Sequence, residues 1–195
     1  MSIVRIVATI AALVATVEIA MAEGAGFWRM AQRVAPNAKP AVQPAPKPAP
    51  MPHRTEIINY DNWTVTCREF TEGPRKRVCS ATLQVRRTEN NQVVLEWTFT
   101  LNDQNRPITV IKTPTGIMIE PGVELQLGKG RARKMPYTSC FPNYCTAVMT
   151  VDGRFVRDVG AAPAADIVIR AANGAGLKFN ISLKGFDKSY AALRQ

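Results

Sequence analysis

The chain has 195 residues, a formal net charge of +10, four cysteines and a single histidine, His53. This length suits one folded domain with a single core and terminal extensions. Having one histidine argues against most enzymes that rely on that side chain as a general base. The positive charge favours anionic partners.

Residues 1–22 have the pattern of a cleaved export signal. Arg5 precedes an apolar run at 6–17, and Ala20-Met21-Ala22 supplies the small residues that a signal peptidase requires, with cleavage after Ala22. The run is shorter than the roughly 20 apolar residues that span a bilayer, which argues against a membrane anchor. We therefore expect an exported protein, in the periplasm or associated with the outer membrane, whose membrane association is peripheral rather than integral.

Residues 23–54 form a spacer rich in proline and alanine. Seven prolines lie between positions 36 and 52. Each removes a backbone donor and fixes φ, so the segment should be extended and disordered. A ligand for a proline-binding module is the alternative. We favour a tether that holds a folded domain at a distance from the membrane or the cell wall.

Residues 55–195 form the predicted folded domain, in which apolar and polar residues alternate. Such alternation is typical of antiparallel strands with one buried and one solvated face. It is clear at 63–67, 79–86, 93–101 and 177–184. Turn residues divide the middle of the domain into further strands near 107–112, 116–120, 123–127 and 131–136, and another run spans 146–151. The pattern predicts an all-β fold, an antiparallel β-sandwich of about nine or ten short strands.

Two segments depart from the strand pattern. After Gly185, the residues Phe186, Tyr190 and Leu193 recur at helical spacing, which predicts a short C-terminal helix. Residues 152–165 are ambiguous, because Asp152-Gly153 is typical of a hairpin turn whereas the apolar residues that follow also fit one face of a helix.

The four cysteines predict two disulfides in an exported chain. Cys67 and Cys79 fall on the apolar faces of two consecutive strands, so hairpin geometry brings them together, and Cys140 and Cys145 close a small ring around Pro142-Asn143. Zinc binding by all four is the competing interpretation. The spacings lack the close pairs usual in zinc sites, so we favour disulfides.

No constellation of catalytic, metal-binding or cofactor-binding residues is evident, and we expect a non-enzymatic protein without a cofactor. Ser139 has no histidine in the folded domain to activate it. The carboxylate pairs Glu120 with Glu124 and Asp152 with Asp158 fit solvated or turn-forming roles better than glycosidase chemistry.

Clustered cations provide the candidate binding residues. The folded domain carries 19 Lys and Arg against 13 Asp and Glu. Three clusters stand out as candidate anion-binding residues: Arg75, Lys76 and Arg77; Arg86 and Arg87; and Lys129, Arg131, Arg133 and Lys134. Such a patch suits an anionic envelope lipid, lipopolysaccharide or a host glycan or protein, and a solvated surface is the alternative. Sequence-specific nucleic-acid binding is not expected, because no aromatic residues are interleaved with these cations.

Several motifs follow one another in a recognisable order along the domain. They are Trp63-x-x-x-Cys67, Cys79, Thr113-Pro114-Thr115-Gly116-Ile117 leading to Pro121-Gly122-Val123, the pair Cys140 and Cys145 followed by Ala147, and Ser182-Leu183-Lys184-Gly185-Phe186. This order resembles the invasion-associated locus B family of Gram-negative envelope proteins. Tyr144 is a departure, because the family often has glycine before the last cysteine.

The resemblance implies an exported, envelope-associated protein, linked in some pathogens to entry into host cells. It supplies no catalytic residues. We expect a binding protein that recognises an anionic envelope or host-cell component and contributes to host-cell invasion. The alternatives are a periplasmic envelope hydrolase or inhibitor with an unrecognised site, and a structural envelope scaffold.

Overall fold

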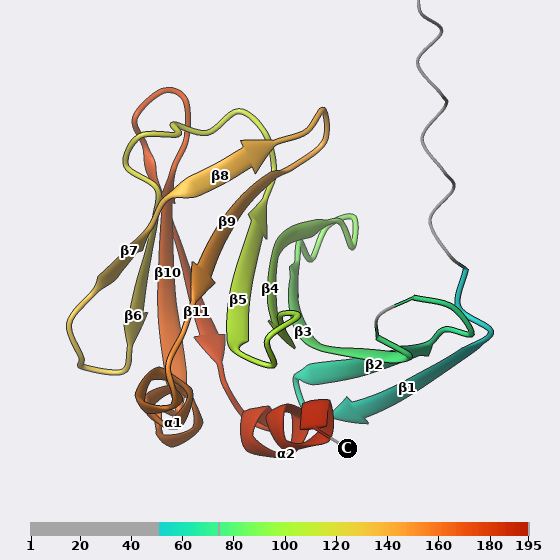
Figure 1. The fold of residues 1–195 in the computed structure, drawn as a ribbon. Coiled ribbons are helices and arrows are strands. Elements are labelled where there is room, and N and C mark those ends of the chain that lie inside the picture. Colours follow the sequence, from blue (N-terminus) through green and yellow to red (C-terminus); the bar gives the residue numbers. More distant parts are fainter. Residues whose placement is uncertain (1–50, 74, 195) are drawn as a thin grey trace, which may run out of the picture. The chain divides into compact units, whose positions relative to one another are not determined.

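The computed structural model describes residues 51–73 and 75–194. The predicted signal at 1–22 and most of the predicted spacer at 23–54 lie outside the described residues. Within the described ranges, eleven strands form two sheets in which all pairs are antiparallel, as the sequence predicts (Figure 1). None of the helices in these ranges is both long and apolar enough to cross a membrane.

The larger sheet has seven strands in the order β1-β2-β3-β4-β5-β9-β8. Its strands are β1 (Arg54–Tyr60), β2 (Trp63–Glu69), β3 (Arg77–Arg86), β4 (Val93–Leu101), β5 (Pro107–Thr113), β8 (Tyr137–Cys140) and β9 (Cys145–Thr150). Strand β1 was not predicted. Only three of its seven residues are even partly buried, and Ile57 is 64% exposed, so the segment lacks a clear apolar face. It is an edge strand that pairs with β2 along its whole length.

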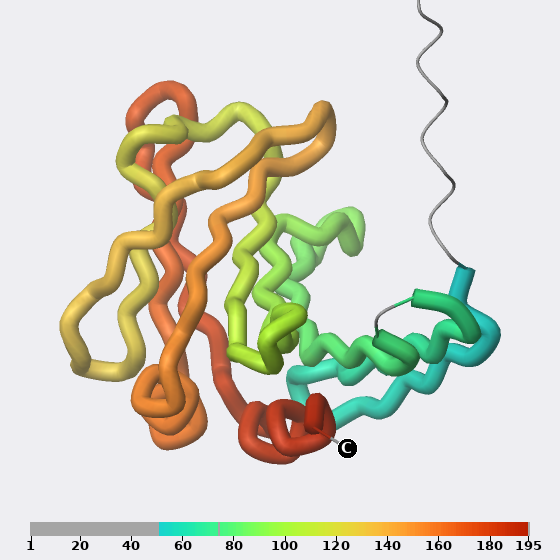
Figure 2. The backbone as a smooth tube through the Cα atoms, in the orientation of Figure 1, coloured from blue at the N-terminus to red at the C-terminus, as the bar shows by residue number. Residues whose placement is uncertain are grey.

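The smaller sheet has four strands in the order β11-β10-β6-β7. They are β6 (Val123–Leu127), β7 (Arg133–Met135), β10 (Ala164–Arg170) and β11 (Gly176–Ser182). Figure 2 shows the chain leaving the larger sheet after β5, building β6 and β7, and returning to the larger sheet through β8 and β9.

The strand predicted at 116–120 does not form, and this prediction is wrong. The segment makes only an isolated bridge, between Ile117 and Ala171. Gly116 and Gly122 adopt positive φ values of 80° and 69°, so the backbone turns at both ends of the segment. The stretch between them therefore does not continue as an extended strand.

The inner faces of both sheets contribute to one hydrophobic core. Trp63 and Trp97 from the larger sheet lie 5.8 Å apart between ring centroids, and both are fully buried. The indole N–H of Trp97 donates a 2.7 Å hydrogen bond to the buried hydroxyl of Thr109. Aromatic rings of this size supply much of the buried apolar area of a small domain.

The predicted C-terminal helix is present as α2 (Phe186–Ala191), followed by a 3-10 turn, η1 (Ala192–Arg194). Phe186 enters the core, with its ring centroid 4.9 Å from that of Phe99. Gly185 precedes the helix with φ of 90°, and a Cβ there would collide with the backbone carbonyl of Tyr60. Glycine is therefore required where α2 begins.

The ambiguous segment at 152–165 forms α1 (Gly153–Ala161) and the start of β10. The side chain of Asp152 accepts a 2.7 Å hydrogen bond from the backbone N–H of Phe155, which is the usual role of aspartate at a helix N-cap. Phe155 and Val159 are buried, one helical turn apart. Both helices lie at the same end of the domain (Figure 1).

Both predicted disulfides are confirmed. Cys67 and Cys79 are directly opposite one another in the β2–β3 ladder, and Cys140 pairs with Cys145 across the β8–β9 turn. No cysteine among the described residues is free, so the zinc interpretation fails. The described residues also contain no cluster of three or more side chains suited to hold a metal ion.

Candidate anion-binding site

The structure separates the nine candidate cations into three places. Arg75, Lys76 and Arg77 lie where the β2–β3 connection enters β3, Arg86 and Arg87 lie in the β3–β4 hairpin, and the remaining four lie in the β6–β7 hairpin. Each group borders a different cavity. The candidates therefore do not form one continuous patch, and each group has to be judged by its own partners.

The first group is largely neutralised by acidic side chains. Arg77 donates to Glu69 at 2.6 Å and to Glu56 at 3.0 Å. Hydrogen bonds to Glu56 and then to Glu69 raise the pKa of Arg77 above its ordinary value. Because Glu56 belongs to β1, which the sequence did not predict, this ion pair could not be foreseen.

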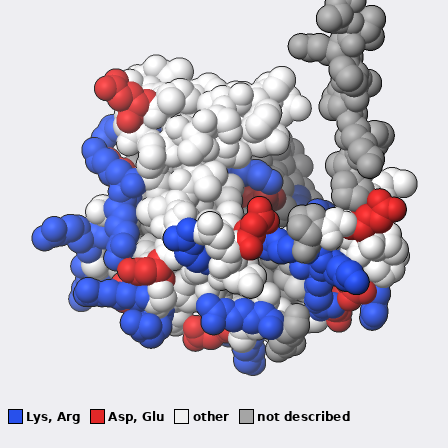
Figure 3. All heavy atoms as spheres, viewed as in Figure 1, with Lys and Arg blue, Asp and Glu red and all other residues white. Residues whose placement is uncertain are grey.

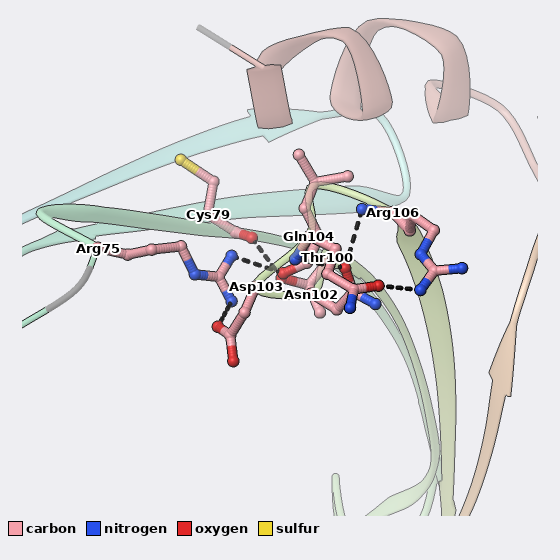
Figure 4. A network of polar contacts seen from close by, with 8 residues as sticks. Arg75, Cys79, Thr100, Asn102, Asp103, Gln104 and Arg106 are labelled. Carbon is pink, nitrogen blue, oxygen red and sulfur yellow. Dashed lines mark hydrogen bonds and ion pairs between the residues drawn. The ribbon is translucent and has the colours of Figure 1, made fainter.

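Arg75 connects two loops rather than facing a free site. Its guanidinium donates to the carbonyl of Leu101 at 2.7 Å and to the carboxylate of Asp103 at 2.8 Å (Figure 4). The β4–β5 turn is closed by Asn102, whose side chain accepts hydrogen bonds from the backbone N–H groups of Gln104 and Arg106. The network fixes the β2–β3 connection against the β4–β5 turn, which is a structural role.

The third group lies beside helix α1, and three of its four residues line a groove there. The β6–β7 hairpin turns at Gly128, where φ is 50°, and Gln126 donates across it to the carbonyl of Gly130 at 2.9 Å. A groove of about 720 Å³ separates this hairpin from α1. We call it the basic groove. Its lining residues are Leu125, Leu127, Gly128, Lys129, Gly130, Arg131, Arg133, Arg154, Asp158, Ala161, Ala162 and Pro163.

The charge in the basic groove is strongly unbalanced. Four cations, Lys129, Arg131, Arg133 and Arg154, line it together with one acid, Asp158. Among the described residues, the side chains of Lys129, Arg131 and Arg154 have no ion pair or hydrogen bond to a protein group. Cations of the hairpin and the helix gather at the lower left of Figure 3. Three cations without an acidic partner among the described residues therefore line the same groove.

Arg133 has a different role from its neighbours. Its guanidinium carbon lies 5.0 Å from the ring centroid of Phe155, and its nearest contact with Asp158 is 3.7 Å. It therefore attaches the hairpin to α1 through a cation–π contact and a loose ion pair. Lys134 follows it in β7 opposite Glu124 and does not line the groove.

Arg154 was missed by the sequence analysis. It enters the site only because residues 153–161 are helical, which places it on the exposed side of α1 while Phe155 and Val159 are buried. The available signal was Asp152 as an N-cap followed by apolar residues at a spacing of four. That signal would have placed Arg154 on the exposed face of a helix, but not beside the β6–β7 hairpin.

Three connections at the opposite end of the domain are almost without charge. The loop at 114–122, the β8–β9 turn and the β10–β11 turn contain one charged residue between them, Glu120. These connections lie together at the top of Figure 1, and the same end is nearly free of Lys and Arg in Figure 3. Phe141 and Tyr144 are 48% and 38% exposed there.

The arrangement of the basic groove suits the binding of a multivalent anion. Guanidinium groups offer forked N–H donors that match phosphate and carboxylate oxygens, whereas lysine adds a point charge. The groove includes one carboxylate and no histidine among its lining residues. His53 lies elsewhere, 3.7 Å from Glu69 beside β2. The geometry therefore supports recognition of an anion more directly than it supports acid–base chemistry.

Comparison with known proteins agrees with this fold. The chain is similar to a structure described as invasion associated protein B from Bartonella henselae, with 23% sequence identity and a TM-score of 0.63 over 71% of this chain and 95% of the other. At this identity the likeness shows the fold. No match was found among the curated proteins. The sequence model described as "Invasion associated locus B (IalB) protein" matches residues 63–194, from the first core tryptophan to the last turn. The chain belongs to the invasion associated locus B family.

Proposed function

We propose that this protein is an exported, non-enzymatic envelope protein that binds an anionic component of the envelope or of a host cell through the basic groove. The observation that supports this is the convergence of Lys129, Arg131 and Arg154 on one space without an acidic partner among the described residues. The favoured partner is the phosphate of an anionic lipid or of lipopolysaccharide. The carboxylates and sulfates of a host glycan or protein offer similar chemistry.

Two features support a location in the periplasm or at the outer membrane. The sequence at 1–22 has the pattern of an export signal, and two disulfides are typical of proteins that fold in an oxidising compartment. We further propose that binding of an anionic surface is what links the protein to host-cell invasion, the role carried by the family's description.

The test compares two double variants that remove the same charge from the same two elements. Arg131→Gln with Arg154→Gln removes two cations from the basic groove, whereas Lys134→Gln with Arg157→Gln removes two exposed cations that do not line it. Binding of the mature protein is measured by co-sedimentation with phosphatidylcholine vesicles with and without phosphatidylglycerol, and with purified lipopolysaccharide.

The groove variant should bind about 30-fold more weakly, because each basic residue near an anionic surface contributes roughly 1 kcal/mol. The control variant should lose much less, and binding should weaken as salt is raised. Equal losses in both variants would show that net charge, rather than the groove, attracts the anion. Turnover of either lipid substrate by the mature protein would favour the hydrolase alternative instead.

A further inference from the structure

A second cavity lies along the other edge of the smaller sheet. It is bordered by β11, the β3–β4 hairpin and the loop that follows β5, and its volume is about 630 Å³. We call it the inter-sheet crevice. Its lining residues are Val85, Arg86, Arg87, Thr88, Glu89, Val94, Pro114, Thr115, Gly116, Ile117, Ile169, Gly176, Leu177, Lys178 and Phe179. The basic groove lies beside β7, the opposite edge strand, so the two sites are separate.

The walls of the crevice are apolar. Ile169 is 2% exposed, and Val85, Ile117 and Phe179 are half-buried against the same core. Leu177 alternates with Phe179 along β11, yet it remains 44% exposed. The described residues therefore cover only part of this apolar side chain. The crevice therefore offers apolar surface that a ligand of matching character would bury.

Two local irregularities explain why the space between the sheets stays open here. The β3–β4 ladder shifts its register between Val85 and Arg86, so two residues of β4 oppose one residue of β3. The segment after β5 makes only the single bridge from Ile117 to Ala171 instead of a strand. The loop is held to β10 and its following turn by two backbone hydrogen bonds, from Met118 to Arg170 and from Ala172 to Gly116, and a Cβ at Gly116 would meet no atom within 4 Å.

Three cations and one acid, Glu89, line the crevice. Arg86 is held by hydrogen bonds to Gln84 and to the carbonyl of Asn91, and Lys178 pairs with Asp166 at 2.9 Å. Among the described residues, the side chain of Arg87 has no hydrogen bond or ion pair. Arg87 directly follows the last residue of β3 and lines the crevice. One uncommitted guanidinium thus lies at the entrance to an apolar space.

From this combination we infer that the inter-sheet crevice binds a long-chain fatty acid. Its acyl chain lies between the two sheets against Leu177 and Phe179, and its carboxylate receives the forked donors of Arg87. A single unpaired guanidinium matches a single carboxylate, and the volume lies within the range of small-molecule sites, roughly 300–1,000 Å³. This inference does not rest on the basic groove or on its proposed partner.

The experiment measures displacement of cis-parinaric acid, a fluorescent fatty acid, from the mature protein. Decanoate, dodecanoate and tetradecanoate are compared as competitors, with the monoglyceride of tetradecanoate as an uncharged analogue. Each added methylene that is buried should tighten binding about four-fold, which corresponds to about 0.8 kcal/mol. Replacing the carboxylate by the uncharged head group should weaken binding about 10-fold.

Two matched pairs of variants assign the parts of the site. Arg87→Gln should weaken tetradecanoate binding about 10-fold, whereas Arg131→Gln, which removes an unpaired arginine of the basic groove, should leave it unchanged. Leu177→Asn should weaken binding by a similar factor, whereas Ile57→Asn, at an exposed apolar residue of β1, should not. Leu177 and Ile57 are both exposed, so their asparagine variants are expected to fold, and circular dichroism checks this.

The possible outcomes separate this inference from the proposed function. Loss of fatty-acid binding in the Arg87 and Leu177 variants, with vesicle binding retained, supports the crevice as an independent site. Absence of displacement by any fatty acid, lack of chain-length dependence, or equal losses in the control variants would each overturn the inference. None of these three results would affect the basic groove.

Discussion

The guanidinium of Arg133 lies over the ring of Phe155, with 5.0 Å between the guanidinium carbon and the ring centroid. Arg133 belongs to the exposed β6–β7 hairpin, whereas Phe155 is 1% exposed and stacks on Phe99 in the core. The contact therefore connects one wall of the basic groove to the hydrophobic core. It also explains why one cation of the groove is unsuited to a ligand while its neighbours remain available.

Arg133→Ala should lower the free energy of unfolding by about 1 kcal/mol, because it removes a partly exposed cation–π contact and the packing of the side-chain stem. Chemical denaturation measures this change. Lys134→Ala, the next residue of the same strand, should cost less than about 0.5 kcal/mol. If both substitutions cost the same, the contact with Phe155 does not stabilise the hairpin.

Thr109→Val should destabilise the domain by about 1–3 kcal/mol, because it leaves the buried indole N–H of Trp97 without its 2.7 Å acceptor. Thr109→Ser, which keeps the hydroxyl, should cost much less. Thermal or urea unfolding measures both variants. Trp97→Phe, Thr109→Val and the variant that carries both changes together form a double-mutant cycle. A coupling energy near zero in that cycle would contradict the role given to this hydrogen bond.

Glu96 should contribute to stability at neutral pH and lose that contribution in acid. Burial raises the pKa of Glu96, but hydrogen bonds from Lys112 at 2.8 Å and from Gln84 at 3.0 Å lower it by more, so the net pKa in the folded protein lies below its ordinary value. The folded state then binds the proton less tightly than the unfolded state. This stabilisation is complete above the ordinary pKa of glutamate and disappears as the pH falls through the lowered value.

Lys112→Gln tests this relationship. Removing the ammonium should raise the pKa of Glu96 and move the midpoint of acid unfolding to higher pH, as followed by circular dichroism. Lys76→Gln is the control, because Lys76 is exposed and has no ion pair among the described residues. An unchanged midpoint in the Lys112 variant would mean that Glu96 does not titrate with folding.

The two disulfides should differ in their response to reductant. Cys140 is exposed, whereas Cys67 and Cys79 are 3% and 7% exposed within the core. A mild reductant should therefore open Cys140–Cys145 first, at a cost of about 2 kcal/mol against about 3 kcal/mol for the longer loop of Cys67–Cys79. Alkylation followed by mass spectrometry gives the order of opening. Simultaneous opening of both bonds would show that reduction requires global unfolding.

The strand pattern and both disulfides could be predicted because each depends on local alternation. Cys67 and Cys79 lie on the apolar faces of consecutive strands, and the hairpin places them directly opposite one another. The helix α1 was harder, because one turn of apolar residues fits either a helix or a hairpin until the Asp152 cap is seen. The cations that cluster in the sequence also lie together locally in the structure. Which other segments each cluster contacts could not be predicted from the sequence.

The candidate sites depend on contacts between segments that lie far apart in the chain. Arg77 was a reasonable candidate until its pairing with Glu56 of β1 became visible. Arg87 and Leu177 meet at one crevice only because a register shift and a missing strand leave room between the sheets. Neither irregularity leaves a signal in hydrophobic periodicity, since both arise from how the strands pair.

The nearly uncharged connections at one end of the domain have a consequence for how the protein meets a surface. Positive charge gathers around the β6–β7 hairpin and α1, whereas the three connections at the opposite end carry only Glu120, so we expect the hairpin end to be drawn toward an anionic surface. Such an attraction should turn the hairpin and α1 toward the surface. The Cys140–Cys145 ring, which contains the exposed Phe141 and Tyr144, should then face away from that surface and remain open to a second partner.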